Sequence, residues 1–217
     1  MFFIIILVLG LVTGSLLNTY INSFANNSTD YKRKTSFKYP LIEILTGLVF
    51  ILAFINIGVN IILAKYLCLF SILITIAFID IDHQIIPNRM VVLVLLWGIF
   101  WQIIIPEITL ANALGGALIG GGSLFIIALL SKGGMGGGDI KLMFAGGFIL
   151  GSVLTLLALF ISFLAGALFG IILISLNVKS RKDPIPFGPF LSIGMFISTL
   201  WGRQILLSYQ EIMHVIF

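Results

Sequence analysis

Long apolar runs follow one another along almost the whole chain and are separated by short polar breaks. A helix needs roughly 20 mostly apolar residues to cross the hydrocarbon core of a bilayer. The pattern therefore predicts an all-α polytopic membrane protein with about eight transmembrane helices. We place these spans near residues 1–21, 40–57, 60–80, 89–105, 109–130, 140–151, 152–177 and 187–208. The sixth is short and carries glycines, so we expect it to be tilted, broken or partly re-entrant.

Composition supports the membrane class and excludes several others. Of the 217 residues, 60% are hydrophobic and 9% are charged, and the mean hydropathy is +1.22. Soluble domains have about 45–50% apolar and about 25% charged residues. The single cysteine, Cys68, excludes a disulfide scaffold. The basic residues are too few and too scattered for a nucleic-acid interface, so the expected surroundings are lipid.

The basic residues predict the orientation of the chain. Ten of the twelve lysines and arginines fall on one side of the eight-span map, and Lys65 and Arg203 are the exceptions. Cytoplasmic loops of membrane proteins are enriched in Lys and Arg. We therefore expect these loops in the cytoplasm and both termini outside. The first span lacks a basic n-region and a cleavage site of the A-x-A type, so we expect it to be retained.

A carboxylate at the edge of the hydrocarbon core of a bilayer carries a free-energy penalty, so such a residue is a candidate for a functional role. Asp80 ends the apolar run SILITIAFID, a second acid follows at Asp82, and Pro87 breaks the chain before the next span. A carboxylate at the C-terminal end of a helix opposes the helix dipole, which indicates a functional role for Asp80. We expect four acids outside the spans to be solvated: Asp30, Glu107, Asp183 and Glu211.

A glycine cluster precedes the other prominent acid, Asp139, in the segment SKGGMGGGDIKLMF. Gly136 and Gly138 belong to this cluster, and glycine lets another backbone approach closely. A lone G-x-G-D would indicate only a flexible loop that ends in an N-cap aspartate. Asp80 and Asp139, however, each lie at the cytoplasmic end of a predicted span. We therefore expect both acids to line one shallow cavity.

Two carboxyl groups in one cavity cannot both ionise cheaply, so one keeps its proton near neutral pH. The ionised group can act as a base towards water while the other donates to the carbonyl under attack. This is aspartic-protease chemistry, which needs no metal. Two alternatives stay open. One is a carboxylate-based ion transporter, and the other is an Mg²⁺ or Mn²⁺ enzyme with Asp80, Asp82, His83 and Asp139 as ligands.

Five segments stand out along the chain: GSLLNTYINSF (14–24), YPLIEILTGLVF (39–50), DIDHQIIPN (80–88), GMGGGDIKL (134–142) and PIPFGPFLSIG (184–194). Through them the sequence closely resembles the bacterial prepilin peptidases, the type IV leader peptidases of the G-x-G-D aspartic protease group. The resemblance implies an intramembrane endopeptidase of the bacterial inner membrane, with its active site facing the cytoplasm. Its substrates would be type IV prepilins or pilin-like proteins, cut between the basic leader and the apolar helix.

The resemblance also assigns roles to residues. It implies that Asp80 and Asp139 are catalytic, because an aspartate seven residues before a proline selects Asp80 over Asp82. It implies a supporting group around them: Gly136, Gly138, Lys141, Asp82 and Pro87. It implies a substrate or methylation region in the first two spans: Gly14, Ser15, Asn18 and Glu43.

One departure from the family concerns the region between the first two spans. Many members insert a cytoplasmic domain with paired C-x-x-C motifs there, whereas this chain has a short basic loop over 22–39 without cysteine. A four-cysteine zinc site is therefore impossible, and we expect a single transmembrane peptidase domain over 1–217. The peptidase would need no cofactor. N-methylation of the new N-terminus is left open, and only that activity would use S-adenosylmethionine.

Overall fold

The computed structural model describes residues 2–26, 38–131, 134–180 and 183–216. Within these residues the chain forms α-helices and no strands, which confirms the predicted all-α fold. The helix boundaries lie close to the predicted spans. The helices are α1 (Phe2–Asn26), α2 (Lys38–Ile57), α3 (Ile61–His83), α4 (Asn88–Ile104), α5 (Leu110–Leu130), α6 (Gly137–Leu150), α7 (Ser152–Ser175) and α8 (Gly188–Ile216). The predicted basic loop over 22–39 falls largely outside the described residues.

Not all of these helices are long enough to cross a bilayer alone. In the part of the chain that the structure describes, six are long and apolar enough: α1, α2, α3, α5, α7 and α8. Helix α4 is shorter, and α6 has 14 residues, which at about 1.5 Å per residue reach roughly 21 Å of a roughly 30 Å core. Helix α6 ends at Gly151, whose φ of 78° turns the chain into α7. The expectation of a short sixth segment is therefore confirmed, while the orientation of the termini stays a prediction.

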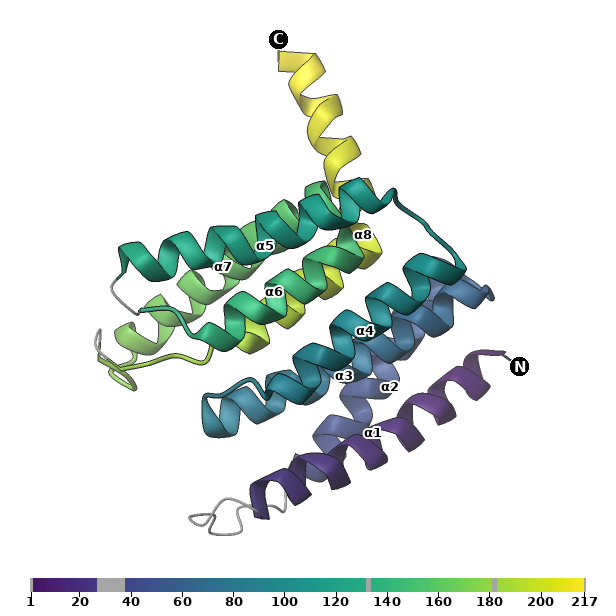
Figure 1. Cartoon of the computed structure of the whole chain (residues 1–217). Helices are drawn as coiled ribbons and strands as arrows, with labels where there is room; N and C mark the ends of the chain where they lie inside the picture. Colours follow the sequence, from purple (N-terminus) through teal and green to yellow (C-terminus); the bar gives the residue numbers. More distant parts are fainter. Residues whose placement is uncertain (1, 27–37, 132–133, 181–182, 217) are drawn as a thin grey trace.

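Helix α6 lies between α4 and α5 (Figure 1). Glycines make the packing of α5 on α6 very close. A Cβ on Gly116 would lie 2.2 Å from the Gly147 carbonyl oxygen, and one on Gly120 would lie 2.3 Å from that of Met143. Side chains at these two positions would push the helices apart. Gly116 and Gly120 therefore act as helix-packing residues, as small residues spaced four apart do on membrane helices.

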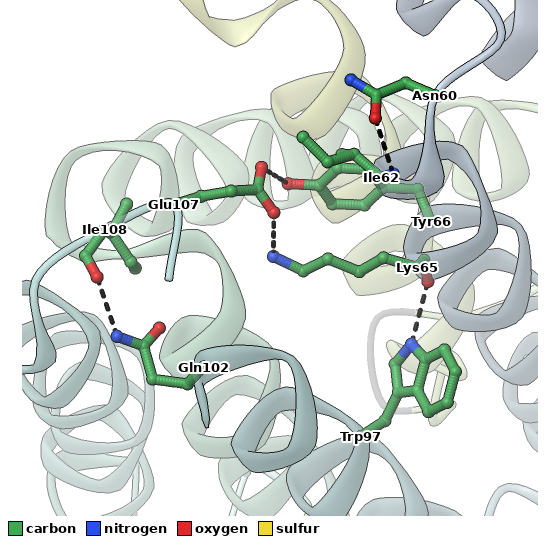
Figure 2. Close-up of polar contacts among 8 residues, drawn as sticks. All are labelled: Asn60, Ile62, Lys65, Tyr66, Trp97, Gln102, Glu107 and Ile108. Carbon is green, nitrogen blue, oxygen red and sulfur yellow. Dashed lines mark hydrogen bonds and ion pairs between the residues drawn. The ribbon is translucent and has the colours of Figure 1, made fainter. Parts of the chain in front are cut away.

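A polar cluster joins α3 to the segment between α4 and α5 (Figure 2). Lys65 Nζ forms an ion pair with Glu107, and Tyr66 Oη donates to the other oxygen of Glu107 at 3.2 Å. The side chains of Lys65 and Glu107 are 7% and 26% exposed. Trp97 Nε1 donates to the Lys65 carbonyl oxygen at 2.9 Å. The expectation that Glu107 is merely solvated is wrong, because its carboxylate neutralises Lys65. Lys65 is one of the two basic residues that do not lie on the side of the chain predicted to be cytoplasmic.

Candidate active site

Asp80 lies in the last turn of α3, with its side chain turned inward and the residue only 5% exposed. The helix ends just after it, at Gln84, which adopts a left-handed conformation and donates its N–H to the Asp80 carbonyl oxygen at 2.8 Å. Pro87 follows and is the N-cap of α4. A proline shortly after a helix C-terminus is common because it cannot continue the helix. The predicted chain break at Pro87 is confirmed.

Asp139 lies in the first turn of α6 and is 8% exposed. The glycines before it permit close approach, as the sequence predicts. A Cβ on Gly138 would lie 2.9 Å from Ile86 Cβ, and one on Gly136 would lie 2.8 Å from Asp139 Oδ2. Side chains at these positions would therefore separate the start of α6 from the connection between α3 and α4, or displace the carboxylate itself.

The structure brings Asp80 and Asp139 together although 58 residues lie between them in the sequence. Both line a cavity of about 230 Å³ that opens between the end of α3 and the start of α6. Its lining residues are Asp80, Gln84, Ile85, Ile86, Asn88, Gly136, Gly137, Gly138 and Asp139. Two carboxyl groups thus face a space large enough for a water molecule and an extended backbone.

The surroundings of Asp139 favour its protonated form. Burial raises its pKa, and the nearby charge of Asp80 raises it further, to about 7. A backbone hydrogen bond from Gly136 opposes this shift without cancelling it. One proton shared between two adjacent carboxyl groups at neutral pH is the arrangement that acid–base chemistry on a carbonyl requires.

A backbone amide that the sequence did not single out also belongs to the site. The N–H of Gly188, the first residue of α8, donates to Asp80 Oδ2 at 2.8 Å in a buried position. A Cβ on Gly188 would lie 2.8 Å from the same oxygen. The hydroxyl of Ser192, one turn later, lies 2.9 Å from the Gly188 carbonyl oxygen and 3.2 Å from that of Leu73, so it ties this helix start to α3. In the sequence, Gly188 belongs to the segment PIPFGPFLSIG, which contributes to the family resemblance. This segment has no ionisable side chain, so nothing in it marked Gly188 as a residue of the site.

Four of the five predicted supporting residues lie at or next to the cavity, and Asp82 does not line it. Gly136 and Gly138 line the cavity, and Pro87 caps the helix that follows it. Lys141 is exposed and donates to Asn88 Oδ1 at 3.0 Å, so it reaches a residue that lines the cavity. Asp82 is half-buried and is not among the residues that line it.

The residues predicted for substrate binding or methylation lie elsewhere, between α1 and α2. A Cβ on Gly14 would lie 2.7 Å from Glu43 Cα, so the two helices are in backbone contact there. Asn18 is 3% exposed and accepts a hydrogen bond from Asn22 Nδ2 at 3.0 Å, whereas Ser15 is exposed. None of the four predicted residues lines the cavity that holds Asp80 and Asp139.

Metal ligation would need a cluster of suitable side chains. Among the residues that the structure describes, no three His, Cys, Asp or Glu side chains come together in a way that could hold an ion. The four residues of the metal alternative, Asp80, Asp82, His83 and Asp139, therefore do not form a ligand set in this structure.

Fold and cavity together define a polytopic helical membrane protein with a buried pair of carboxyl groups at helix ends. The model of the type IV leader peptidase family matches residues 67–171, a range that includes both acids. Curated relatives named prepilin leader peptidase/N-methyltransferase are similar over most of the chain. The relative from Bacillus subtilis (strain 168) is 35% identical over 176 residues, which cover 81% of this chain and 71% of that protein.

Other relatives of the same name give the same result. One from Aeromonas salmonicida (strain A449) is 35% identical over 175 residues, covering 78% of this chain and 60% of that protein. One from Legionella pneumophila is 37% identical over 179 residues, covering 79% of this chain and 61% of that protein. No solved structure matches the chain significantly. The chain belongs to the type IV leader peptidase family.

Proposed function

We propose that this protein is an intramembrane aspartic endopeptidase that removes the basic leader from type IV prepilins or pilin-like proteins. The observation that carries the proposal is the meeting of Asp80 and Asp139 in one cavity at helix ends. The family and the relatives named prepilin leader peptidase supply the substrate class. The relatives give no support to an ion transporter or a metal-dependent enzyme.

Each acid has a distinct role in the proposed reaction. Asp80, ionised and held by the Gly188 N–H, takes a proton from a water molecule as the water oxygen attacks the scissile carbonyl carbon. Asp139, protonated, donates to the carbonyl oxygen. When the tetrahedral intermediate collapses, the C–N bond breaks and the proton gained by Asp80 passes to the leaving nitrogen. Both carboxyl groups then return to their starting state once Asp139 has recovered its proton from the new carboxyl group.

The position of the cavity suits a substrate that changes from polar to apolar at the cut. Asp80 is at the end of a long apolar helix, and Asp139 is at the start of another apolar helix. A basic leader would stay in the cytoplasm, where the positive-inside rule also places the loops next to this cavity. The bare backbone at Gly136 and Gly137 leaves room for an extended strand. We therefore propose a multi-pass protein of the bacterial cytoplasmic membrane with both termini outside and the active site at the cytoplasmic interface.

The whole of 1–217 would form one peptidase domain, in which the loop over 22–39 takes the place of the cysteine-rich insertion. N-methylation of the product is the second activity in the relatives' names. Gly14 and Glu43 lie where the backbones of α1 and α2 are in contact. Methylation with S-adenosylmethionine as the methyl donor stays a prediction, and we derive no methylation step.

The experiment is co-expression with a model prepilin, followed by intact-mass measurement of the product. Wild type is expected to remove the leader, while Asp80→Asn and Asp139→Asn leave it attached although both variants still insert in the membrane. Asp183→Asn is the matched control, because this exposed acid lies outside the cavity. Cleavage by either dyad variant would overturn the aspartic mechanism. An extra 14 Da on the product, the mass of a methylene group, would reveal methylation in the same spectrum.

A further inference from the structure

A groove adjoins the cavity on the outer face of α6. It has a volume of about 620 Å³, with α6 between the lining residues of α4 on one side and those of α5 on the other. Its body is apolar, formed by Val92 and Leu95 of α4, Phe125 of α5 and Phe144 of α6. In Figure 1, α6 lies between α4 and α5, and no other helix of the described chain lies over the side of α6 that faces away from α8.

The groove continues from the site. Asn88 lines both the groove and the cavity that holds Asp80 and Asp139. Lys141, which donates to Asn88, and Ile140 also line the groove, and they directly follow Asp139 in the chain. The polar residues Asn88 and Lys141 are thus at the end of the groove next to the carboxyl groups, and the remainder of the groove is lined by apolar residues. The same order of polar and apolar character is expected along a substrate that enters the membrane just after its scissile bond.

Gly122 of α5 lines this groove, and helix packing within the chain does not require a glycine there. Gly116, Gly120 and Gly121 of α5 all face α6 so closely that a Cβ would meet atoms at 2.2–2.9 Å. Gly122 differs, because a Cβ there would meet no atom within 4 Å. The packing of this chain therefore does not explain the missing side chain. Small residues on membrane helices allow close approach of another helix.

We infer that the groove between α4 and α5 receives the first turns of the substrate's apolar helix, directly after the bond that is cut. This inference rests on the proposed function and adds where the substrate is held. From Asn88 to Leu95 the wall spans eight residues, whose seven rises of about 1.5 Å give about 10 Å, or two helical turns. Helix α6 starts at the cavity, with Asp139 in its first turn, so a substrate helix that lies on α6 and starts at the cavity would run in the same direction.

The first test fills the groove. Gly122→Trp adds a large side chain where none is in contact, so the fold is retained. The KM for full-length prepilin is expected to rise about tenfold or more, because the added side chain keeps a buried part of the substrate helix out of the groove. A tenfold rise corresponds to about 1.4 kcal/mol of binding free energy. Leu164→Trp is the matched control, since Leu164 on α7 is exposed and outside the groove. Normal cleavage by Gly122→Trp, with an active wild type, overturns the inference and leaves the proposed function intact.

The second test detects contact without turnover. Cys68 is the only cysteine, so Cys68→Ser with Gly122→Cys gives a single reactive thiol, and Asp139→Asn keeps the substrate whole. Prepilins with one cysteine in the first eight helix positions are expected to cross-link to it at positions three or four apart. The control is Ala77→Cys, in the apolar groove of about 520 Å³ between α2, α3 and α8. Cross-links to position 77 and none to position 122 would place the substrate in that groove and overturn the inference.

Discussion

Gly188 offers the sharpest test of how the site holds Asp80. Two substitutions separate the backbone hydrogen bond from the space that it needs. Gly188→Ala keeps the N–H but puts a Cβ 2.8 Å from Asp80 Oδ2 and 3.1 Å from Cγ. Gly188→Pro adds a Cβ as well and removes the N–H altogether. Proline is tolerated at the first position of a helix, where Gly188 lies, so both variants are expected to fold.

The magnitude follows from the type of hydrogen bond. A hydrogen bond to a charged group contributes about 1.5–3 kcal/mol. Loss of that much stabilisation of ionised Asp80 before the reaction decreases the fraction of enzyme whose base is ionised, and so lowers kcat by at most about 10- to 150-fold. We therefore expect kcat to decrease in the order wild type, Gly188→Ala, Gly188→Pro. KM should stay within about twofold, because Gly188 contacts Asp80 and not the proposed substrate groove.

The assay is steady-state cleavage of purified prepilin in detergent, with thermal unfolding measured on the same samples. Gly194→Ala is the control, since it lies on the same helix and its Cβ would meet Ser162 Oγ at 2.2 Å, far from Asp80. It should lower the unfolding temperature and leave kcat of the folded enzyme unchanged. If Gly188→Pro cleaves as fast as Gly188→Ala, the amide does not hold the base and the reasoning is refuted.

Three further predictions follow from other parts of the structure. Cleavage should decline as the pH rises above about 7, because Asp139 then loses the proton that it donates; a rate that is constant from pH 6 to 9 would contradict this. Glu107→Gln should lower the free energy of unfolding by about 3 kcal/mol, because Lys65 is left buried without its ion-pair partner, and adding Lys65→Met should restore part of it in urea or thermal unfolding. Gly120→Ala should cost about 1–3 kcal/mol in the same assay, since its Cβ would meet a backbone oxygen at 2.3 Å, whereas Gly122→Ala should be neutral.

Hydropathy and chain breaks were enough to predict the helices, because a bilayer requires long apolar segments and leaves few alternatives. The pairing of Asp80 with Asp139 was also accessible, since both acids lie at matching ends of predicted spans. The Gly188 amide was not, because every residue except proline has a backbone N–H and no side chain marks the one that matters. The partners of Glu107 and Lys141 were missed for a related reason. The contacts of Glu107 with Lys65 and of Lys141 with Asn88 depend on which face of a helix packs against a segment distant in sequence. The hydropathy pattern does not contain that information.

The hydrogen bond between α8 and Asp80 has a consequence for how the protein matures. Asp80 and Asp139 belong to α3 and α6, which are synthesised before α8, the helix that supplies the amide holding Asp80. Helices are inserted in the membrane as they emerge from the ribosome. The nascent chain therefore carries both acids in the bilayer before the base has its donor. We expect full proteolytic activity only when α8 docks, so that a chain without α8 in place cleaves its neighbours slowly at most.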